Sequence, residues 1–259
     1  MITAGIDIGL ENIKIVIFDG DKVLARAIGR SGGAGRGAAA QELYGQALEA
    51  AGLTTDEVEN VIATGQGKYD VPFASGTVTE PAAAAAAALY FDADANMVMD
   101  AGADQVRVAP IKEDGKPGQL VFNQKCSAGL GTLIRYLAHR LDLSFEEVSA
   151  LGEAEAKGTR LNDGCVVFAE LDAFEELSKR TPREQIAAAA NVVAGYRLNA
   201  ILHDKEKPEK SDKVVLIGGL TQNAAVMDVL RERSGIEFII PQDAVYGCAL
   251  GAAIKAERS

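Results

Sequence analysis

Two short segments of the sequence combine an aspartate and a glycine at the end of an apolar run. The first, GIDIGLENIK, contains Asp7 and Gly9, and the second, MDAGADQVR, contains Asp100 and Gly102. An aspartate at a strand end can hold a hydrated magnesium ion, and a glycine after it lets backbone N–H groups approach phosphate without a Cβ in the way. Each segment therefore predicts magnesium-assisted phosphate binding, with an ordinary Asp-x-Gly turn as the alternative.

The two segments belong to an internal repeat. The second copy lies 93 residues after the first, as from Asp7 to Asp100 and from Lys14 to Arg107. Each copy reads as a strand, an Asp-x-Gly turn and a second strand that ends in a tight turn, FDGD in one copy and EDGK in the other. The repeat favours the phosphate interpretation, because two such loops facing each other would bind one nucleotide.

A third glycine segment, VVLIGGLTQN, contains Gly218, Gly219 and Asn223. Two glycines after a buried strand leave bare backbone against which a flat adenine and ribose can lie. We therefore predict that Gly218, Gly219 and Asn223 contribute to nucleotide binding, together with Lys14 next to the first loop. A Gly-Gly pair at a strand end is also a common turn, so this segment gains its meaning from the other two.

Cys126 and Cys165 are the residues best suited to redox chemistry. Cys126 lies in NQKCSAGLG and Cys165 in NDGCVVFAE, and each follows a polar stretch with an asparagine and precedes an expected helix. The unpaired N–H groups and the dipole at a helix start stabilise a thiolate, and equally an anionic iron–sulfur cluster that the thiolate ligates. Cys248, in YGCALGAA, is set among small apolar residues and is predicted to be a buried hydrophobe.

An alternation of strands and helices must position these residues. Runs of β-branched and aliphatic residues predict strands at 2–8, 12–19, 22–29, 58–65, within 98–111, and at 119–123, 214–219 and 237–240. Apolar residues at helical spacing predict helices at 38–52, 81–91, 128–140, 144–155, 166–179 and 182–203, with two more after 219 and at the C-terminus. Together with the repeat, this order predicts two duplicated α/β domains, 1–95 and 96–259, the second carrying Cys126 and Cys165.

The composition limits the classes of partner. The chain has 259 residues, 48% of them hydrophobic, which is enough for a sizeable core. Its net charge of −11 and the lack of a lysine or arginine cluster argue against nucleic acid or a membrane surface as a partner. Three scattered cysteines do not make a disulfide framework, and the N-terminal residues show no basic stretch before an apolar one, so we expect a cytoplasmic protein. The alanine-rich run 81–91 is too short to cross a bilayer and reads as a buried helix with small side chains.

The three glycine segments, in this order, resemble the actin, sugar kinase and Hsp70 ATPase superfamily. Its two phosphate loops correspond to 5–14 and 98–107, and its adenosine loop corresponds to 214–223. The resemblance covers nearly the whole chain, and it implies that fold, with ATP and Mg²⁺ as ligands.

The cysteine segments closely resemble a narrower group, the BadF/BadG/BcrA/BcrD ATPase family of benzoyl-CoA reductase ATPase subunits and 2-hydroxyacyl-CoA dehydratase activators. That family has an Asn-x-x-Cys-x-Ala-Gly-x-Gly segment, matched around Cys126, and a Cys-x-Val-Phe-Ala-Glu segment, matched around Cys165. The resemblance implies that Cys126 and Cys165 supply two of the four thiolates of a [4Fe–4S] cluster, which a second, related or identical subunit completes. It also implies that ATP hydrolysis drives electrons from a ferredoxin-type donor into an acyl-CoA reductase or dehydratase.

In this family the aspartates would act at the nucleotide. Asp7 and Asp100 would hold magnesium, and Asp104, or Gln105 beside it, would orient the attacking water. The chain departs from the family pattern in the second loop, which reads DAGADQ where relatives have Asp-Ile-Gly-Gly-Gln-Asp. In the first loop, Leu10 and Glu11 replace two hydroxyl-bearing residues, and the carboxylate brings negative charge towards a polyphosphate.

The first-loop departure favours a benzoyl-CoA reductase ATPase subunit, because a heterodimer can keep one divergent ATPase chain. A homodimeric 2-hydroxyacyl-CoA dehydratase activator is the alternative within the family. Two further alternatives are a small-molecule kinase of the pantothenate kinase type, with structural cysteines, and a scaffold subunit that contributes cysteines without hydrolysing ATP.

Overall fold

The computed structural model describes residues 1–122, 129–204 and 212–257. Strands and helices alternate along the chain as expected from the sequence, and they form two five-stranded sheets. The chain divides into two compact units, each assembled from separate stretches. Unit 1 consists of 1–98, 109–119 and 241–259, and unit 2 consists of 99–108 and 120–240. The division of the chain into two duplicated domains, 1–95 and 96–259, stays a prediction.

The first sheet opens with the expected meander. Its strand order is β3-β2-β1-β4-β5, where β1 is Thr3–Ile8, β2 is Asn12–Phe18, β3 is Val23–Arg30, β4 is Asn60–Thr64 and β5 is Gly76–Thr77. The hairpins make β1, β2 and β3 antiparallel neighbours, whereas β4 returns parallel to β1 through a helix. The carboxyl ends of β1 and β4 therefore lie at the same edge of the sheet.

The second sheet has the same order of strands. It runs β8-β7-β6-β9-β10, where β6 is Met97–Ala101, β7 is Val106–Pro110, β8 is Val121–Phe122, β9 is Val214–Ile217 and β10 is Phe238–Ile239. β7 pairs antiparallel with β8, and β9 pairs parallel with β10, as β2 does with β3 and β4 with β5. The repeat seen in the sequence is thus a duplication of sheet topology.

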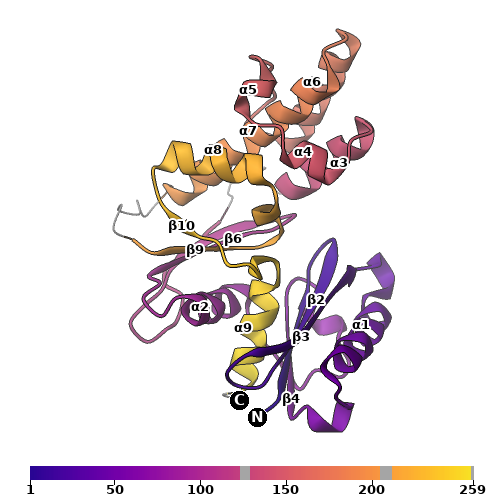
Figure 1. Ribbon diagram of the computed structural model, residues 1–259, viewed down its shortest axis with the longest axis vertical. Helices are drawn as coiled ribbons and strands as arrows, with labels where there is room; N and C mark the ends of the chain where they lie inside the picture. Colours follow the sequence, from indigo (N-terminus) through magenta and orange to yellow (C-terminus); the bar gives the residue numbers. More distant parts are fainter. Residues whose placement is uncertain (123–128, 205–211, 258–259) are drawn as a thin grey trace. The chain divides into compact units, whose positions relative to one another are not determined.

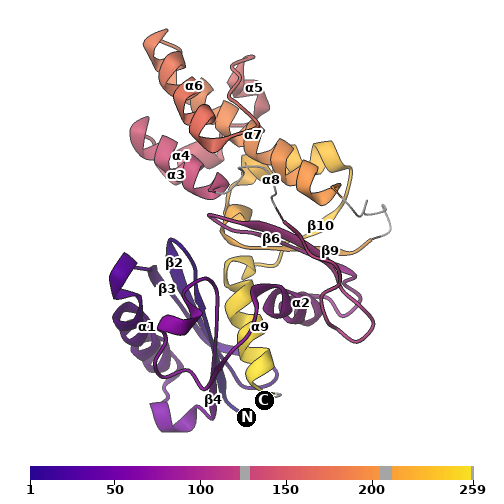
Figure 2. The same ribbon diagram turned by 180° about the vertical axis from the view of Figure 1, so that it is seen from behind.

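The helices lie close to their expected positions. They are α1 (Arg36–Ala51), α2 (Glu80–Phe91), α3 (Leu130–Arg140), α4 (Phe145–Ser149), α5 (Glu153–Ala156), α6 (Val166–Ser178), α7 (Arg183–Leu202), α8 (Ala224–Ser234) and α9 (Gly247–Ala256). Figure 2 shows α3 to α8 gathered on one side of the second sheet. No helix among the described residues is long and apolar enough to span a membrane.

The single helix expected at 144–155 is wrong. The chain forms α4 and α5 there, with Gly152 extended between them at φ −82° and ψ −172°. The side chain of Asn191, on α7, donates to the carbonyls of Val148 (2.7 Å) and Leu151 (2.9 Å). Because this amide satisfies carbonyls that a break leaves exposed, the helix can end without leaving buried acceptors unpaired.

The central strands of the first sheet, β1, β2 and β4, are largely buried, and helices lie on each side of the sheet (Figure 1). Ile13, Ile15 and Ile17 of β2 pack in one cluster with residues of α1, while Val16 and Phe18 pack with residues of α9. This alternation follows from the two-residue period of a strand. The alanine-rich α2 is buried, as predicted, and it packs against α9.

Small residues are required where α9 crosses α2. A Cβ on Gly251 would overlap the carbonyl group of Ala83 and lie 2.9 Å from its Cα. We expect Gly251→Ala to lower the free energy of unfolding by about 1–3 kcal/mol, because backbone must shift to admit the methyl group. Gly45→Ala on α1, where a Cβ would meet none of the described residues within 4 Å, is the control and should raise stability by about 0.5–1 kcal/mol. Urea denaturation of both variants checks this, and equal midpoints would contradict it.

Candidate functional site

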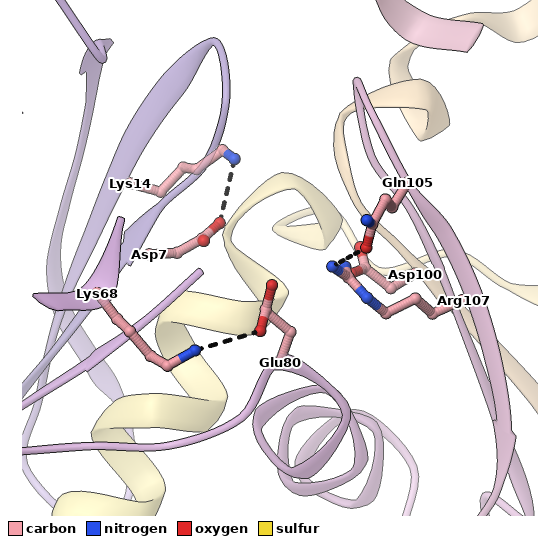
Figure 3. A network of polar contacts seen from close by, with 7 residues as sticks. All are labelled: Asp7, Lys14, Lys68, Glu80, Asp100, Gln105 and Arg107. Carbon is pink, nitrogen blue, oxygen red and sulfur yellow. Dashed lines mark hydrogen bonds and ion pairs between the residues drawn. The ribbon is translucent and has the colours of Figure 1, made fainter. Parts of the chain in front are cut away.

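Asp7 is the penultimate residue of β1 and lies next to a basic side chain of the neighbouring strand. The antiparallel register sets Asp7 opposite Lys14, and Lys14 Nζ donates to Asp7 Oδ2 at 3.1 Å (Figure 3). Both side chains are mostly buried, with 12% and 16% of their surfaces exposed. The pair stands at the first phosphate loop, where Gly9 N–H donates to the Asn12 carbonyl at 3.1 Å and closes a tight turn.

The residue after β4 is a glycine that packs closely against Asp7 and Ile8. A Cβ on Gly65, which has φ +89°, would lie 2.5 Å from Oδ1 of Asp7. Thr64 is the partner of Asp7 across the parallel β1–β4 ladder, and its buried hydroxyl has no hydrogen-bond partner among the described residues. A bound water is the usual partner of such an orphaned hydroxyl, and waters also complete the shell of a magnesium ion.

Three further polar residues of unit 1 were missed from the sequence. Ser31 donates its hydroxyl to the Gly9 carbonyl at 2.7 Å and so ties β3 to the first loop. Lys68 Nζ lies 4.0 Å from Oε2 of Glu80, which begins α2, and both side chains are largely buried (Figure 3). These contacts cannot be predicted from a local sequence pattern, because each joins residues that are more than ten positions apart in the sequence.

The second loop repeats the arrangement of the first. Arg107 on β7 donates to Asp100 Oδ2 at 3.3 Å and to Gln105 Oε1 at 2.6 Å (Figure 3). Gly102 N–H donates to the Gln105 carbonyl at 3.0 Å, the counterpart of the Gly9 turn. Arg107 was not among the predicted site residues, although the 93-residue repeat aligns it with Lys14. Each loop thus joins a largely buried carboxylate to a cation.

The glycine pair Gly218-Gly219 follows β9, and Gly218 packs against the start of the second loop. Gly218 has φ +101°, and a Cβ there would overlap the backbone of Ala101, the last residue of β6. Only glycine permits both that conformation and that approach. A Cβ on Gly219 would have no described residue within 4 Å, so among these residues the backbone is open on the side where a ligand could lie. Unit 2 therefore brings together Asp100, Gly102 and the glycine pair.

Asn223 has a structural role in unit 2. It is fully buried, its Oδ1 accepts from Val226 N–H at 3.0 Å as the N-cap of α8, and its Nδ2 donates to Asn191 Oδ1 at 2.9 Å. The hydroxyl of Thr221, within the glycine loop, donates to the Gly218 carbonyl at 2.7 Å. Contact of Asn223 with nucleotide stays a prediction, and its described bonds hold the glycine loop to α7 and α8.

Asp104 touches the start of α3 through its backbone. Its carbonyl accepts from Gly129 N–H at 2.7 Å, and the Ala103 carbonyl accepts from Thr132 N–H at 3.1 Å. Cys126 and residues 123–128 lie outside the described residues. The role of Asp104 in orienting water stays a prediction, and so does ligation by Cys126.

Cys165 is the N-cap of α6 and is half-buried. Its N–H and that of Gly164 both donate to Asn162 Oδ1 at 2.8 Å, while Asn162 N–H donates to Asp172 Oδ2 at 2.7 Å. These bonds fix the cysteine loop on its own helix. The first-turn N–H groups of α6 receive no side-chain cap from the described residues, so they are available to stabilise a thiolate at Cys165.

The other cysteine and the remaining acidic groups do not extend this site. Cys248 is 7% exposed within α9, which confirms the buried position predicted for it. Within the described ranges, no three His, Cys, Asp or Glu side chains gather as a metal site.

The chain is similar along nearly its whole length to a dehydratase activating ATPase and to a benzoyl-CoA reductase subunit. It is 28% identical over 256 residues to the (R)-2-hydroxyglutaryl-CoA dehydratase activating ATPase of Acidaminococcus fermentans, covering 98% of this chain and 96% of that protein. It is also 28% identical over 262 residues to a benzoyl-CoA reductase subunit of Thauera aromatica, covering 98% and 92% of the two chains.

The fold and the family agree. The crystal structure of component A of the Acidaminococcus fermentans dehydratase matches with a TM-score of 0.86 at 27% identity, covering 100% of this chain and 98% of that one. This likeness confirms the predicted actin and sugar kinase-like ATPase fold. The model of one ATPase family matches residues 4–256. The chain belongs to the BadF/BadG/BcrA/BcrD ATPase family.

Proposed function

We propose that this protein is an ATP-hydrolysing subunit that activates electrons for an acyl-CoA reductase or dehydratase. The observation that carries the proposal is the repeated loop, in which Asp7 pairs with Lys14 and Asp100 pairs with Arg107 at equivalent strand ends. Family membership adds ATP and Mg²⁺ as the ligands. Both relatives reported above are named for work with an acyl-CoA system, which supports the acyl-CoA partner.

The two loops are the proposed binding elements for a magnesium-bound triphosphate. Asp7 and Asp100 are the proposed carboxylates for the hydrated ion, and the backbone of Gly9 and Gly102 is proposed to bind phosphate. Magnesium, when bound, neutralises charge that develops on the transferred phosphoryl group. Asp104 or Gln105 is the proposed water-orienting residue, and the bond from Arg107 to Gln105 fixes that amide next to Asp100.

Cys126 and Cys165 are the proposed ligands of a shared [4Fe–4S] cluster. The helices that follow these residues, α3 and α6, pack against each other, which supports convergence of the two thiolates. A cluster held by four thiolates carries single electrons at low potential. The position of Cys165 is restrained by its hydrogen bond to Asn162 and by its place as the N-cap of α6, which supports a role as a ligand.

A protein contact at Cys165 is supported by the surface of α6. Val167, Phe168 and Leu171 are 58%, 56% and 55% exposed, and they lie in the first two turns of α6, which begins after the cysteine. Apolar side chains that gather on a surface usually mark an interface. The proposed partner at the cluster is a second ATPase subunit, either a related chain or another copy of this one, in a cytoplasmic system that takes electrons from a ferredoxin-type donor.

Two candidates remain for the acyl-CoA partner. Leu10, which is 41% exposed in the first phosphate loop, and Glu11 beside it make that loop divergent, and this favours a benzoyl-CoA reductase ATPase subunit with a non-identical second chain. Similarity over the full length to the dehydratase activating ATPase, with a TM-score of 0.86 to component A of the same system, favours a 2-hydroxyacyl-CoA dehydratase activator.

Protein purified without oxygen tests the proposal. We expect brown protein with about four irons and four sulfides per two chains, which sizes as a dimer, hydrolyses ATP and dissociates as oxygen destroys the cluster. A colourless ATP-dependent kinase would overturn the proposal, and an iron-loaded dimer without hydrolysis would leave a scaffold subunit. An active homodimer favours the dehydratase activator, whereas dependence on a related second chain favours the reductase.

A further inference from the structure

We infer that the second phosphate loop and the start of α3 form one mechanical unit, with Gly131 as the positioning residue that keeps them in contact. This inference rests on the proposed function, because it assigns the route by which nucleotide at residues 102–104 acts on the helix that follows the cysteine segment. Both partners of the contact lie in unit 2 and within the described residues.

The loop serves as the N-terminal cap of α3. The N-cap position is Gly129, at φ +87°, which has no side chain to accept from the first turn. The Ala103 carbonyl accepts from Thr132 N–H at 3.1 Å, and the Asp104 carbonyl accepts from Gly129 N–H at 2.7 Å. The loop backbone therefore takes the place of the side chain that usually caps a helix.

Gly131 is what allows this approach. A Cβ at this position would lie 2.8 Å from Cα of Ala103 and 3.2 Å from the carbonyl oxygen of Gly102. Both atoms belong to backbone, which cannot rotate away as a flexible side chain can. The helix start is thus seated on the loop with no intervening side chain.

The opposite directions of N–H and C=O groups in the loop peptides explain how phosphate binding at the loop would affect the start of α3. In a trans peptide the N–H and C=O groups point in opposite directions. A loop that turns N–H groups towards phosphate turns carbonyls away from it, and here the carbonyls of Ala103 and Asp104 go to α3. Rotation of these peptides on phosphate binding or release must therefore shift or break the bonds to Gly129 and Thr132.

Hydrogen exchange tests the inference on the wild-type protein. We expect a non-hydrolysable ATP analogue with Mg²⁺ to change exchange at the amides of Gly129 and Thr132, with α1 (36–51) as an internal reference that does not respond. Binding of the analogue is measured separately, so failure of the ATPase proposal would be visible as no binding. Bound analogue with unchanged exchange at the start of α3 would overturn the inference alone.

The variant Gly131→Ala should separate hydrolysis from electron delivery. We expect it to bind the analogue but to lose the exchange response, and to lower electrons delivered per ATP at least about tenfold. Gly195→Ala on α7 is the matched control, because its Cβ would press on the side chain of Val229 within the same unit and away from the loop. An equal loss in both variants, or a normal response in Gly131→Ala, would contradict a specific role for Gly131.

Discussion

Cys165→Ser is expected to leave the protein folded and without bound iron. Serine is a preferred N-cap residue, since its hydroxyl accepts from first-turn N–H groups, and Cys165 is the N-cap of α6. The helix should therefore keep or gain stability, by about 1 kcal/mol at most. The thiolate is lost, and two thiolates per chain leave no spare ligand for a shared cluster. Iron, sulfide and visible absorbance of anaerobic protein measure the effect.

Two companion variants make this result specific. Cys126→Ser should lose iron equally, whereas Cys248→Ser, buried in α9 in unit 1, should keep the full content. Thermal unfolding of all three shows whether the fold survives. Full iron in Cys165→Ser would remove the cluster from the proposed function, although the ATPase assignment from the two loops would stand.

The fold was largely predictable because its strands and helices have strong local patterns. The features that sequence reasoning missed depend on distant residues or on very short segments. The break between α4 and α5 is supported by Asn191, about forty residues further on and in the middle of another helix. β5 has only the two residues Gly76 and Thr77 and carries no periodicity of its own. The return of residues 241–259 to unit 1 likewise leaves no local trace in the sequence.

The equivalence of the two loops could be predicted from the internal repeat. The alignment of the two copies placed Asp7 opposite Asp100, and the same alignment of Lys14 with Arg107 could have predicted the second ion pair that the structure shows. Binding of nucleotide by these residues stays a prediction. Asn223 shows the opposite case. An asparagine just before a helix is as typical of an N-cap as of a ligand contact, and only its burial and its bonds to Val226 and Asn191 reveal the structural role.

Asp100→Asn is expected to lower ATP turnover at least about a hundredfold while iron content stays unchanged, because it removes charge from the proposed magnesium site and not from the thiolates. Asparagine keeps the shape of the side chain and an acceptor for Arg107, which lies 3.3 Å from Asp100 Oδ2 in a setting where Asp100 is 8% exposed.

Asp228→Asn is the matched control, since Asp228 is in the same unit, is 68% exposed and pairs along α8 with Arg231. It should hydrolyse ATP at the wild-type rate, and both variants should melt within a few degrees of wild type. Asp7→Asn tests the repeat: a loss as large as that of Asp100→Asn would mean that both loops are needed for hydrolysis. Wild-type turnover in Asp100→Asn would instead assign Asp100 and Arg107 to joining β6 and β7, and the hydrolytic site would then have to belong to the partner chain.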